Sequence, residues 1–230
     1  GGAVYVFHGK SNPYYNNDLR SGTFEMTGGT ITECKSFSDG CGVFTQSKVD
    51  IGGTAKITSN RPLKWNALQL IDGKYPNVQL SGGHGGAIYA TGDKAVVTMS
   101  GGELSNNLAE SGGAVMLWTG STMTMTGGKM DGNYAMGKPS LGNGGALYIQ
   151  GSTFNFNGGT LSNNVANRYG GAINTNQGAT LNISGNCIIS GNKASHGGGI
   201  SQEAGECSLT LNGTGIQITN NEAHGHQVNI

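Results

Sequence analysis

Carboxylate side chains are the first groups of this sequence to consider for chemistry. A glycoside hydrolase needs two carboxylates facing one bond, and a lyase needs a base, typically beside acidic calcium ligands. The 13 Asp and Glu residues are dispersed along the chain. The spacing of these residues brings together only two pairs, Glu25 with Asp50 and Glu203 with Glu206. It places no Arg or Lys beside either pair. The sequence therefore predicts a non-catalytic protein, with a polysaccharide lyase or glycoside hydrolase as the alternative.

Histidine and cysteine side chains offer metal and disulfide chemistry. His196 and His224 fall about one repeat apart, but spacing fixes no third Asp, Cys or His beside them. A metal ion needs at least three such ligands, so we expect neither a metal site nor a cofactor. Cys34 and Cys41 flank a turn within one repeat, which leaves a disulfide between them open.

The charge of the chain argues against two classes of partner. Lys and Arg number 13, equal to Asp and Glu, and the arginines are scattered. Nucleic acid binding requires clustered basic residues, so we expect no nucleic acid partner. No run of 18 apolar residues occurs, so we expect this segment not to insert into a membrane. The chain begins inside a motif that recurs downstream, which indicates a piece of a longer protein.

Glycine makes up 43 of the 230 residues and marks an internal repeat. The motif Gly-Gly-Ala-apolar recurs about every 27 residues, followed by an alternating strand that ends in a glycine pair, such as Met123–Gly128. A third block, apolar-Ser/Thr/Asp-x-Asn-x-Ala, follows, as in Leu161–Ala166. The first motif begins at Gly1, Gly85, Gly112, Gly144 and Gly170, with degenerate copies at Gly40, Gly197 and Gly225.

Three short strands, each with its own turn, in about 27 residues are typical of one coil of a parallel β-helix. The sequence predicts an all-β, right-handed parallel β-helix, three-sided with about eight coils, as one domain over residues 1–230. We count nine strands after the glycine motif. One is Ala67–Leu70, placed in a truncated coil, and the last lies at Val228. The first glycine of each motif is expected to adopt positive φ at a tight corner.

One asparagine recurs at the same place in each repeat. Asn tolerates the left-handed turn conformation, and its amide can bond to the Asn one coil away. We therefore predict a structural ladder, with Cys34 in the asparagine position of the first full coil. Its members are Asn60, Asn107, Asn133, Asn164, Asn192 and Asn221.

The motif Gly-Gly-Ala-apolar resembles that of the chlamydial polymorphic outer membrane proteins and related bacterial surface adhesins. Their second motif, Phe-x-x-Asn, is altered here, since Ile, Leu or Met replaces Phe, as in Leu161–Asn164. The resemblance covers nearly the whole chain at the level of the repeat. It implies an exported, adhesive β-helix of the pectin-lyase-like type, located outside the cell or at its surface.

The strand after the glycine motif presents a column of side chains that we expect to face solvent. Its aromatic members could stack on sugar rings or contact a protein. Trp118 borders the column, and Tyr14 and Tyr15 lie in an insertion, a common place for specificity. We expect a glycan or a surface protein as partner, with a structural spacer or end-to-end self-association as the alternative. The candidate ligand-binding residues of the column are Tyr5, Phe44, Tyr89, Met116 and Tyr148, and the column also contains Gln69, Asn174, Ser201 and Asn229.

Overall fold

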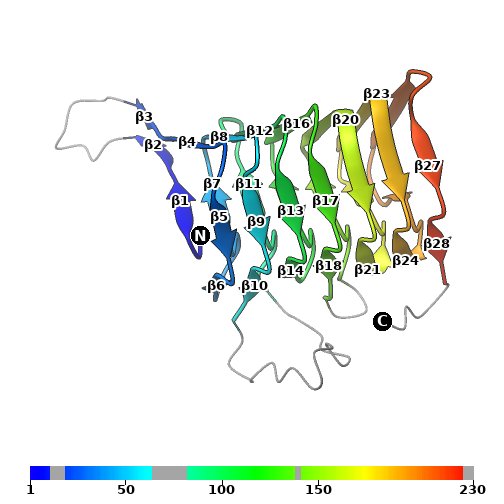
Figure 1. Cartoon of the computed structure of the whole chain (residues 1–230), viewed down its shortest axis with the longest axis horizontal. Coiled ribbons are helices and arrows are strands. Elements are labelled where there is room, and N and C mark those ends of the chain that lie inside the picture. Colours follow the sequence, from blue (N-terminus) through cyan, green and yellow to red (C-terminus); the bar gives the residue numbers. More distant parts are fainter. Residues whose placement is uncertain (11–18, 64–81, 138–140, 225–230) are drawn as a thin grey trace.

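A computed structural model describes residues 1–10, 19–63, 82–137 and 141–224. The described chain is all β-structure and forms a right-handed parallel β-helix of about six turns (Figure 1). The described residues contain no helix of the length and apolarity that crossing a bilayer requires. The all-β architecture and the parallel stacking of turns confirm the predicted fold class, but the turns number about six and not the eight expected.

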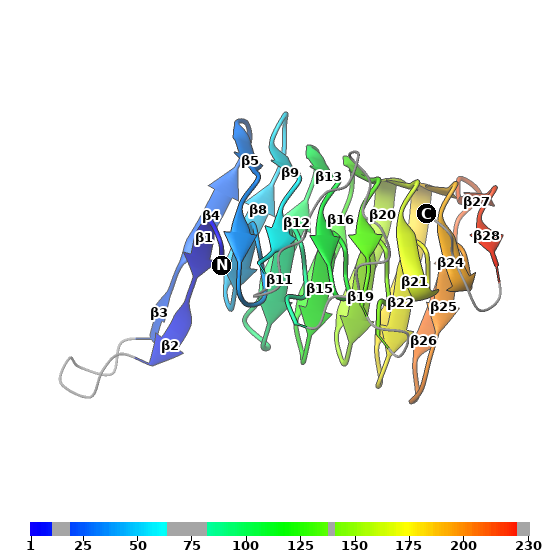
Figure 2. The same cartoon turned by 90° about the horizontal axis from the view of Figure 1, so that it is seen from below.

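One side of the rod is a seven-stranded parallel sheet, here called sheet A. Its strands lie side by side in Figure 2. They are β1 (Val4–Val6), β7 (Val43–Thr45), β11 (Ile88–Thr91), β15 (Val115–Trp118), β19 (Leu147–Gln150), β22 (Ile173–Asn176) and β25 (Ile200–Gln202).

Two further stacks, ladder 1 and ladder 2, join into one large sheet because two long strands belong to both. Ladder 1 contains β4 (Thr23–Met26), β8 (Lys48–Ile51), β12 (Val96–Met99), β16 (Thr122–Met125), the first parts of β20 (Thr153–Ser162) and β23 (Thr180–Ser190), and β26 (Ser208–Asn212). Ladder 2 contains β5 (Thr30–Thr32), β9 (Lys56–Thr58), β13 (Glu103–Ser105), β17 (Lys129–Asp131), the second parts of β20 and β23, and β27 (Gln217–Thr219).

A short strand that the sequence did not predict ends each turn. These strands are β6 (Lys35–Ser36), β10 (Arg61–Pro62), β14 (Leu108–Ala109), β18 (Tyr134–Ala135), β21 (Val165–Tyr169), β24 (Lys193–His196) and β28 (Glu222–Ala223). Separately, β2 (His8–Lys10) and β3 (Leu19–Ser21) form an antiparallel pair.

The expected truncated coil is wrong, because β7 and β11 are direct neighbours. Val43 of β7 pairs with Ile88 of β11 on one edge and with Val4 of β1 on the other. A strand has two edges, so no further strand fits between β7 and β11. Ala67–Leu70 and Val228 lie outside the described residues. Six steps between the seven strands of sheet A give a rod of about 29 Å, at about 4.8 Å per step.

Alternation along each strand fills the interior with stacked apolar side chains. In ladder 1, Val97, Met123, Phe154 and Leu181 lie in register on successive strands and are fully buried. The rings of Phe154 and Phe156 stack at 5.7 Å between centroids. Full burial of such a side chain contributes about 1.5–3 kcal/mol, so each turn is stabilised by adding its side chains to these columns.

The glycine motif forms the corner before sheet A. The first glycine has positive φ in each described copy from Gly40 to Gly197, which confirms the prediction for this position. Gly144, for example, has a φ of 67°. The second glycine is required by close stacking, since a Cβ on Gly145 would overlap the carbonyl oxygen of Gly171 in the next turn.

The asparagine side chains form a continuous hydrogen-bonded column, here called the asparagine ladder. It lies at the corner between the strands of ladder 2 and the short strands. Asn164 accepts from the backbone N–H and the Nδ2 of Asn133 at 3.0 and 2.9 Å. Its own Nδ2 donates to Asn192 Oδ1 at 2.9 Å and to the Met130 carbonyl at 3.1 Å. The same side-chain bonds link every pair from Asn60 to Asn221, so these buried amides are satisfied at both ends.

The left-handed conformation belongs to the residue before each ladder asparagine and not to the asparagine itself. Ser59, Asn106 and Asn163 have φ values of 58°, 54° and 54°. The chain bends at that residue, so the asparagine that follows points inward to the neighbouring turns. Cys34 begins the column and contributes its backbone N–H to it, which donates to Asn60 Oδ1 at 2.9 Å.

Replacing Asn164 with Ala is expected to lower the free energy of unfolding by about 2–4 kcal/mol, because buried groups of Asn133, Asn192 and Met130 lose their partners. Chemical denaturation measures the loss. Asn157→Ala is the control, since Asn157 is exposed and accepts a hydrogen bond from Ser184. It should change stability by less than about 0.5 kcal/mol. Equal losses in both variants would show that an asparagine of the asparagine ladder contributes no more to the free energy of unfolding than an exposed asparagine does.

Candidate functional site

The outer face of sheet A carries two columns of side chains, because alternate residues of a strand point away from the core. Column 1 contains Tyr5, Phe44, Tyr89, Met116, Tyr148, Asn174 and Ser201, which lie in register on successive strands. Column 2 lies two residues further along and contains Thr91, Trp118, Gln150 and Asn176. It continues to Glu203, whose backbone N–H donates to the Thr175 carbonyl at 2.8 Å.

The N-terminal part of this face is a stack of aromatic rings. Tyr5 stacks on Phe44 with 5.0 Å between ring centroids, and Phe44 stacks on Tyr89 at 5.3 Å. Tyr5 is 57% exposed, and Phe7, which stacks on it at 6.3 Å, is 51% exposed. Because the rings are nearly parallel, they cover one another's faces, and a ligand would meet mainly ring edges and the outer ring.

The expectation of a solvent-facing column is wrong for its middle. Tyr89 and Tyr148 are each 8% exposed, and Met116 is fully buried. The three side chains pack together, with Phe44 and Trp118 partly buried against them. Side chains in register on parallel strands lie about 4.8 Å apart, so large ones cover one another. The rings and the Met116 side chain in the middle of column 1 therefore form a packed apolar cluster and not a contact surface, and the Tyr148 hydroxyl is the part of the cluster that meets the polar groups beside it.

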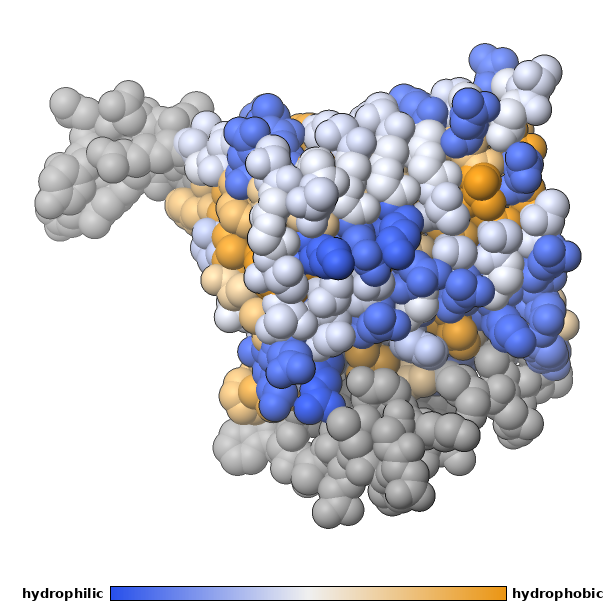
Figure 3. All heavy atoms as spheres, viewed as in Figure 1, coloured by the Kyte–Doolittle hydropathy of each residue, from blue (hydrophilic) through white to orange (hydrophobic). Residues whose placement is uncertain are grey.

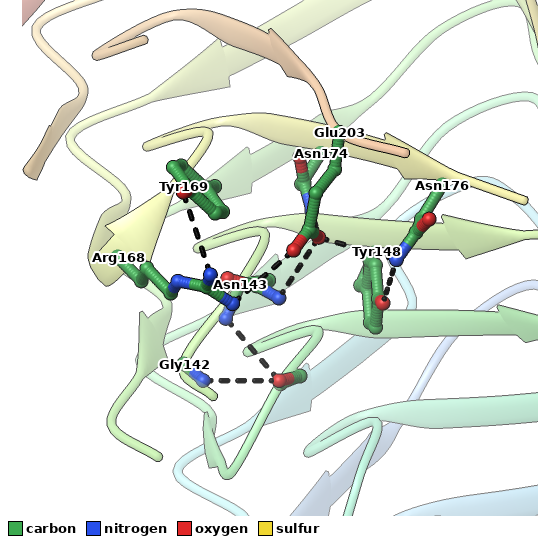
Figure 4. Close-up of polar contacts among 9 residues, drawn as sticks. Gly142, Asn143, Tyr148, Arg168, Tyr169, Asn174, Asn176 and Glu203 are labelled. Carbon is green, nitrogen blue, oxygen red and sulfur yellow. Dashed lines mark hydrogen bonds and ion pairs between the residues drawn. The ribbon is translucent and has the colours of Figure 1, made fainter. Parts of the chain in front are cut away.

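The C-terminal part of the face is a polar network centred on Glu203 (Figure 4). Glu203 Oε1 lies 3.1 Å from Arg168 Nη1. Glu203 Oε2 accepts from three amides, at 3.2 Å from Asn174 Nδ2, 3.2 Å from Asn176 Nδ2 and 3.4 Å from Asn143 Nδ2. The carboxylate is thus held by one guanidinium and three amide groups, which fixes its position on the face.

Four turns of the solenoid contribute to this network. Asn174 and Asn176 lie on β22, and Glu203 follows β25. Arg168 lies on β21, at the corner before the glycine motif, and Asn143 occupies the equivalent corner one turn earlier. The Tyr148 hydroxyl of β19 accepts from Asn176 Nδ2 at 3.0 Å and so joins the apolar cluster to the network.

The three amides of the network differ from those of the asparagine ladder in one respect. The Oδ1 atoms of Asn143, Asn174 and Asn176 are buried and have no hydrogen-bond partner among the described residues. Their Nδ2 groups are directed to Glu203, which leaves these oxygens as acceptors without donors. A buried acceptor left unpaired costs about 1–3 kcal/mol, so three in one cluster mark a site that lacks hydrogen donors.

Spacing in the sequence predicted no basic residue beside either carboxylate pair, and this prediction is wrong for both. Arg168 pairs with Glu203, and its guanidinium lies 4.2 Å from the centroid of the Tyr169 ring. Lys48 Nζ lies 2.8 Å from Asp50 on ladder 1. Spacing alone missed Arg168 because it comes from a corner, where the direction of the side chain depends on the path of the turn.

The two histidines considered for a metal site do not stack. The register of β24 and β28 places His224 beside Ser195, one position away from His196. The His196 ring lies 5.3 Å from Tyr169, and His224 Nε2 lies 2.9 Å from Glu222 Oε2. Within the described ranges, no three His, Cys, Asp or Glu side chains are grouped closely enough to hold a metal ion.

Cys34 and Cys41 are free thiols, so the disulfide that the sequence left open is not formed. The short strand β6 separates them. Cys34 lies at the start of the asparagine column, where its thiol donates to the Thr32 carbonyl at 3.4 Å. Cys41 lies in the glycine corner, where burial raises its pKa to about 12. Each thiol is thus engaged at a different corner of the turn.

The sequence-derived candidates and the observed network overlap only in part. Tyr14 and Tyr15 lie outside the described residues. Two members of the predicted column take part in the network, Tyr148 through Asn176 and Asn174 through its bond to Glu203. Asn176 and Glu203 could have been found by following each strand two residues past column 1. No comparable signal in the sequence pointed to Arg168.

Comparison with protein-family models, with curated proteins and with solved structures gave no match to this chain.

Tyr89 makes the stability of the fold sensitive to alkaline pH. Burial raises its pKa to about 12, and the charge of Asp39 adds to the shift. Burial also raises the pKa of Tyr148, against the opposing effect of the hydrogen bond from Asn176. Because the folded pKa of Tyr89 exceeds the ordinary value of about 10, its contribution is full below about pH 10 and is lost as the pH rises through about 12.

Denaturation across this range should therefore show falling stability, and Tyr89→Phe should flatten the fall. The same variant should remove a late step from the alkaline titration of tyrosinate absorbance. An unchanged titration in Tyr89→Phe would contradict a buried, late-ionising phenol at this position.

Glu203→Ala is expected to lower the free energy of unfolding by about 1–3 kcal/mol, because Arg168 and three amides lose their acceptor. Thermal or chemical denaturation measures the change. Glu206→Ala, an exposed position in the same turn, is the matched control and should be nearly neutral. A neutral result at Glu203 would mean that the network does not hold this turn.

Proposed function

We propose that this chain is a non-catalytic, adhesin-type β-helix that binds a glycan through the outer face of sheet A. One observation carries the proposal. The two columns of this face pass from the exposed ring of Tyr5, stacked on the partly buried Phe44, to an amide, carboxylate and guanidinium network around Glu203. Sugars are bound by apolar contact with aromatic side chains together with hydrogen bonds from planar polar groups.

The state of Glu203 supports binding over catalysis. Hydrolysis by two carboxylates requires one that accepts or releases a proton near the scissile bond. Here one oxygen of Glu203 is held by Arg168, and the other accepts from three amides. Both oxygens of Glu203 are thus occupied by groups of the protein itself. A lyase or hydrolase stays the alternative proposal, because an Arg and a Tyr lie beside this carboxylate.

A location outside the cell or at its surface is part of the same proposal. Its support is the Gly-Gly-Ala-apolar repeat, which resembles the chlamydial polymorphic outer membrane proteins and surface adhesins. The four cysteines add no support, since all four are free thiols and disulfides are the feature that marks an oxidising compartment.

End-to-end self-association is a second candidate, favoured by the apolar side chains at the C-terminal end. Leu209, Leu211 and Ile218 continue the core columns but are 38%, 53% and 42% exposed. Figure 3 shows apolar colour toward both ends of the rod, with a largely neutral and hydrophilic surface between them. Stacking a second copy would place Cys34 next to Asn221, and a thiol supplies no oxygen to extend the amide ladder. Glycan binding is therefore the preferred proposal.

A glycan array probed with the wild type and with Tyr5→Ala/Phe44→Ala tests the proposed function. The double variant should bind about tenfold more weakly or worse, since two aromatic contacts of about 0.5–1.5 kcal/mol each are lost. Thr124→Ala/Asn155→Ala, on the partly exposed surface of ladder 1, is the control and should bind as the wild type does.

Two results would contradict the proposal. The first is a wild type that binds no glycan on the array. The second is the appearance of new reducing or unsaturated ends when the protein is incubated with uronic-acid polysaccharides, which would establish an enzyme.

A further inference from the structure

We infer that Asn143, Asn174 and Asn176, together with Glu203, form a subsite that takes the hydroxyl groups of an uncharged sugar residue. This inference rests on the proposed function and narrows it to one class of glycan. It is carried by the three unpaired oxygens, by the charge balance of the network and by the exposure of its rim.

The unpaired groups of the network are acceptors, and this decides what a ligand must bring. The Oδ1 atoms of Asn143, Asn174 and Asn176 need hydrogen donors. A sugar hydroxyl can donate to one of them and accept from another group at the same time. A carboxylate, sulfate or phosphate brings only acceptors, which would face these oxygens and the Glu203 carboxylate without a hydrogen between them.

The charges of the network cancel within it. Arg168 lies 3.1 Å from Glu203, so the guanidinium that could attract an acidic sugar already has a carboxylate beside it. A divalent cation such as Ca²⁺ is bound by several oxygens, commonly including more than one carboxylate. Glu203 is the one carboxylate of this network, and Arg168 opposes a second positive charge next to it. The balance therefore favours a neutral ligand over an anion or a cation.

The network has an accessible rim and a buried floor. The side chains of Arg168 and Glu203 are 31% and 20% exposed, and Asn176 is half-buried. Asn174 is fully buried and Asn143 is 3% exposed, so they form the floor. The three Oδ1 atoms are buried in this structure, so a hydroxyl meets the Asn176 and Glu203 side chains first. It reaches these oxygens when the side chains of the rim shift, or through a bridging water.

Tyr148 adds a donor to this arrangement. Its hydroxyl oxygen accepts from Asn176 Nδ2 at 3.0 Å, so the hydroxyl hydrogen can be directed to a sugar oxygen. A phenol keeps this hydrogen at neutral pH, since its ordinary pKa is about 10, and burial raises the pKa of Tyr148 further. The subsite thus offers both acceptors and a donor, as the alternating groups of a sugar ring require.

Isothermal titration calorimetry with defined oligosaccharides tests the inference. The neutral probes are cellotetraose, mannotetraose and xylotetraose, and the acidic probe is tetragalacturonate. The wild type should bind at least one neutral probe and bind tetragalacturonate more weakly. Asn176→Ala should weaken neutral binding by about tenfold, the effect of about 1.4 kcal/mol. Asn182→Ala, a partly exposed asparagine of ladder 1, is the control and should bind within about twofold of the wild type.

The variant Glu203→Gln gives a second test that does not depend on Asn176. It is expected to raise the affinity for an acidic oligosaccharide. It keeps the size of the side chain but removes the charge that offsets Arg168. Tetragalacturonate should then bind about tenfold more tightly than to the wild type, because Arg168 has lost its carboxylate partner. Circular dichroism confirms that each variant is folded before titration.

The outcomes separate the inference from the proposed function. If Asn176→Ala keeps wild-type affinity, the subsite holds an ordered water only, and the inference is wrong while glycan binding elsewhere on the face stands. The inference also fails if the wild type prefers tetragalacturonate, or if Glu203→Gln gains no acidic binding. If neither the array nor calorimetry detects any bound glycan, the inference and the proposed function fall together.

Discussion

In-register stacking of one turn on the next is the constraint on which the rest of this structure depends. Backbone hydrogen bonds join each strand to its equivalent in the adjacent turn, and the asparagine ladder fixes the same register at a corner through buried side chains. Shifting a strand by one residue would exchange its inner and outer faces. The ladder therefore maintains the apolar interior and, with it, the order of side chains on the surface.

The surface chemistry of the rod follows from columns and not from local sequence motifs. Equivalent positions lie about 4.8 Å apart, so a change of residue type from turn to turn becomes a change along the face. On sheet A the change falls at Tyr148, which packs against Met116 on one side and accepts from Asn176 on the other. The proposed glycan site depends on this transition, since it places apolar and polar groups on one continuous face.

Asparagine serves two different purposes in this fold, and the difference lies in how its amides are satisfied. In the ladder, Asn107, Asn133 and Asn164 use both the oxygen and the nitrogen of the side chain in hydrogen bonds to neighbouring turns. In the network, Asn174 and Asn176 donate to Glu203 but leave their oxygens unpaired. The first arrangement stabilises the solenoid, and the second leaves binding capacity for a donor. Composition alone gives no means of telling them apart.

The amino-acid sequence by itself determined the solenoid, the period of about 27 residues, the positive φ of the first corner glycine and the position of the asparagine column. These follow from local patterns, because alternation, glycine corners and repeated blocks act within one turn. The tertiary structure decided which turns are neighbours. It paired β7 directly with β11, where the sequence had suggested a coil between them. It also buried Tyr89, Met116 and Tyr148 in contact with one another and placed Arg168 beside Glu203. Those outcomes depend on contacts between residues tens of positions apart, and a repeat pattern fixes the class of such contacts but not the direction of each side chain.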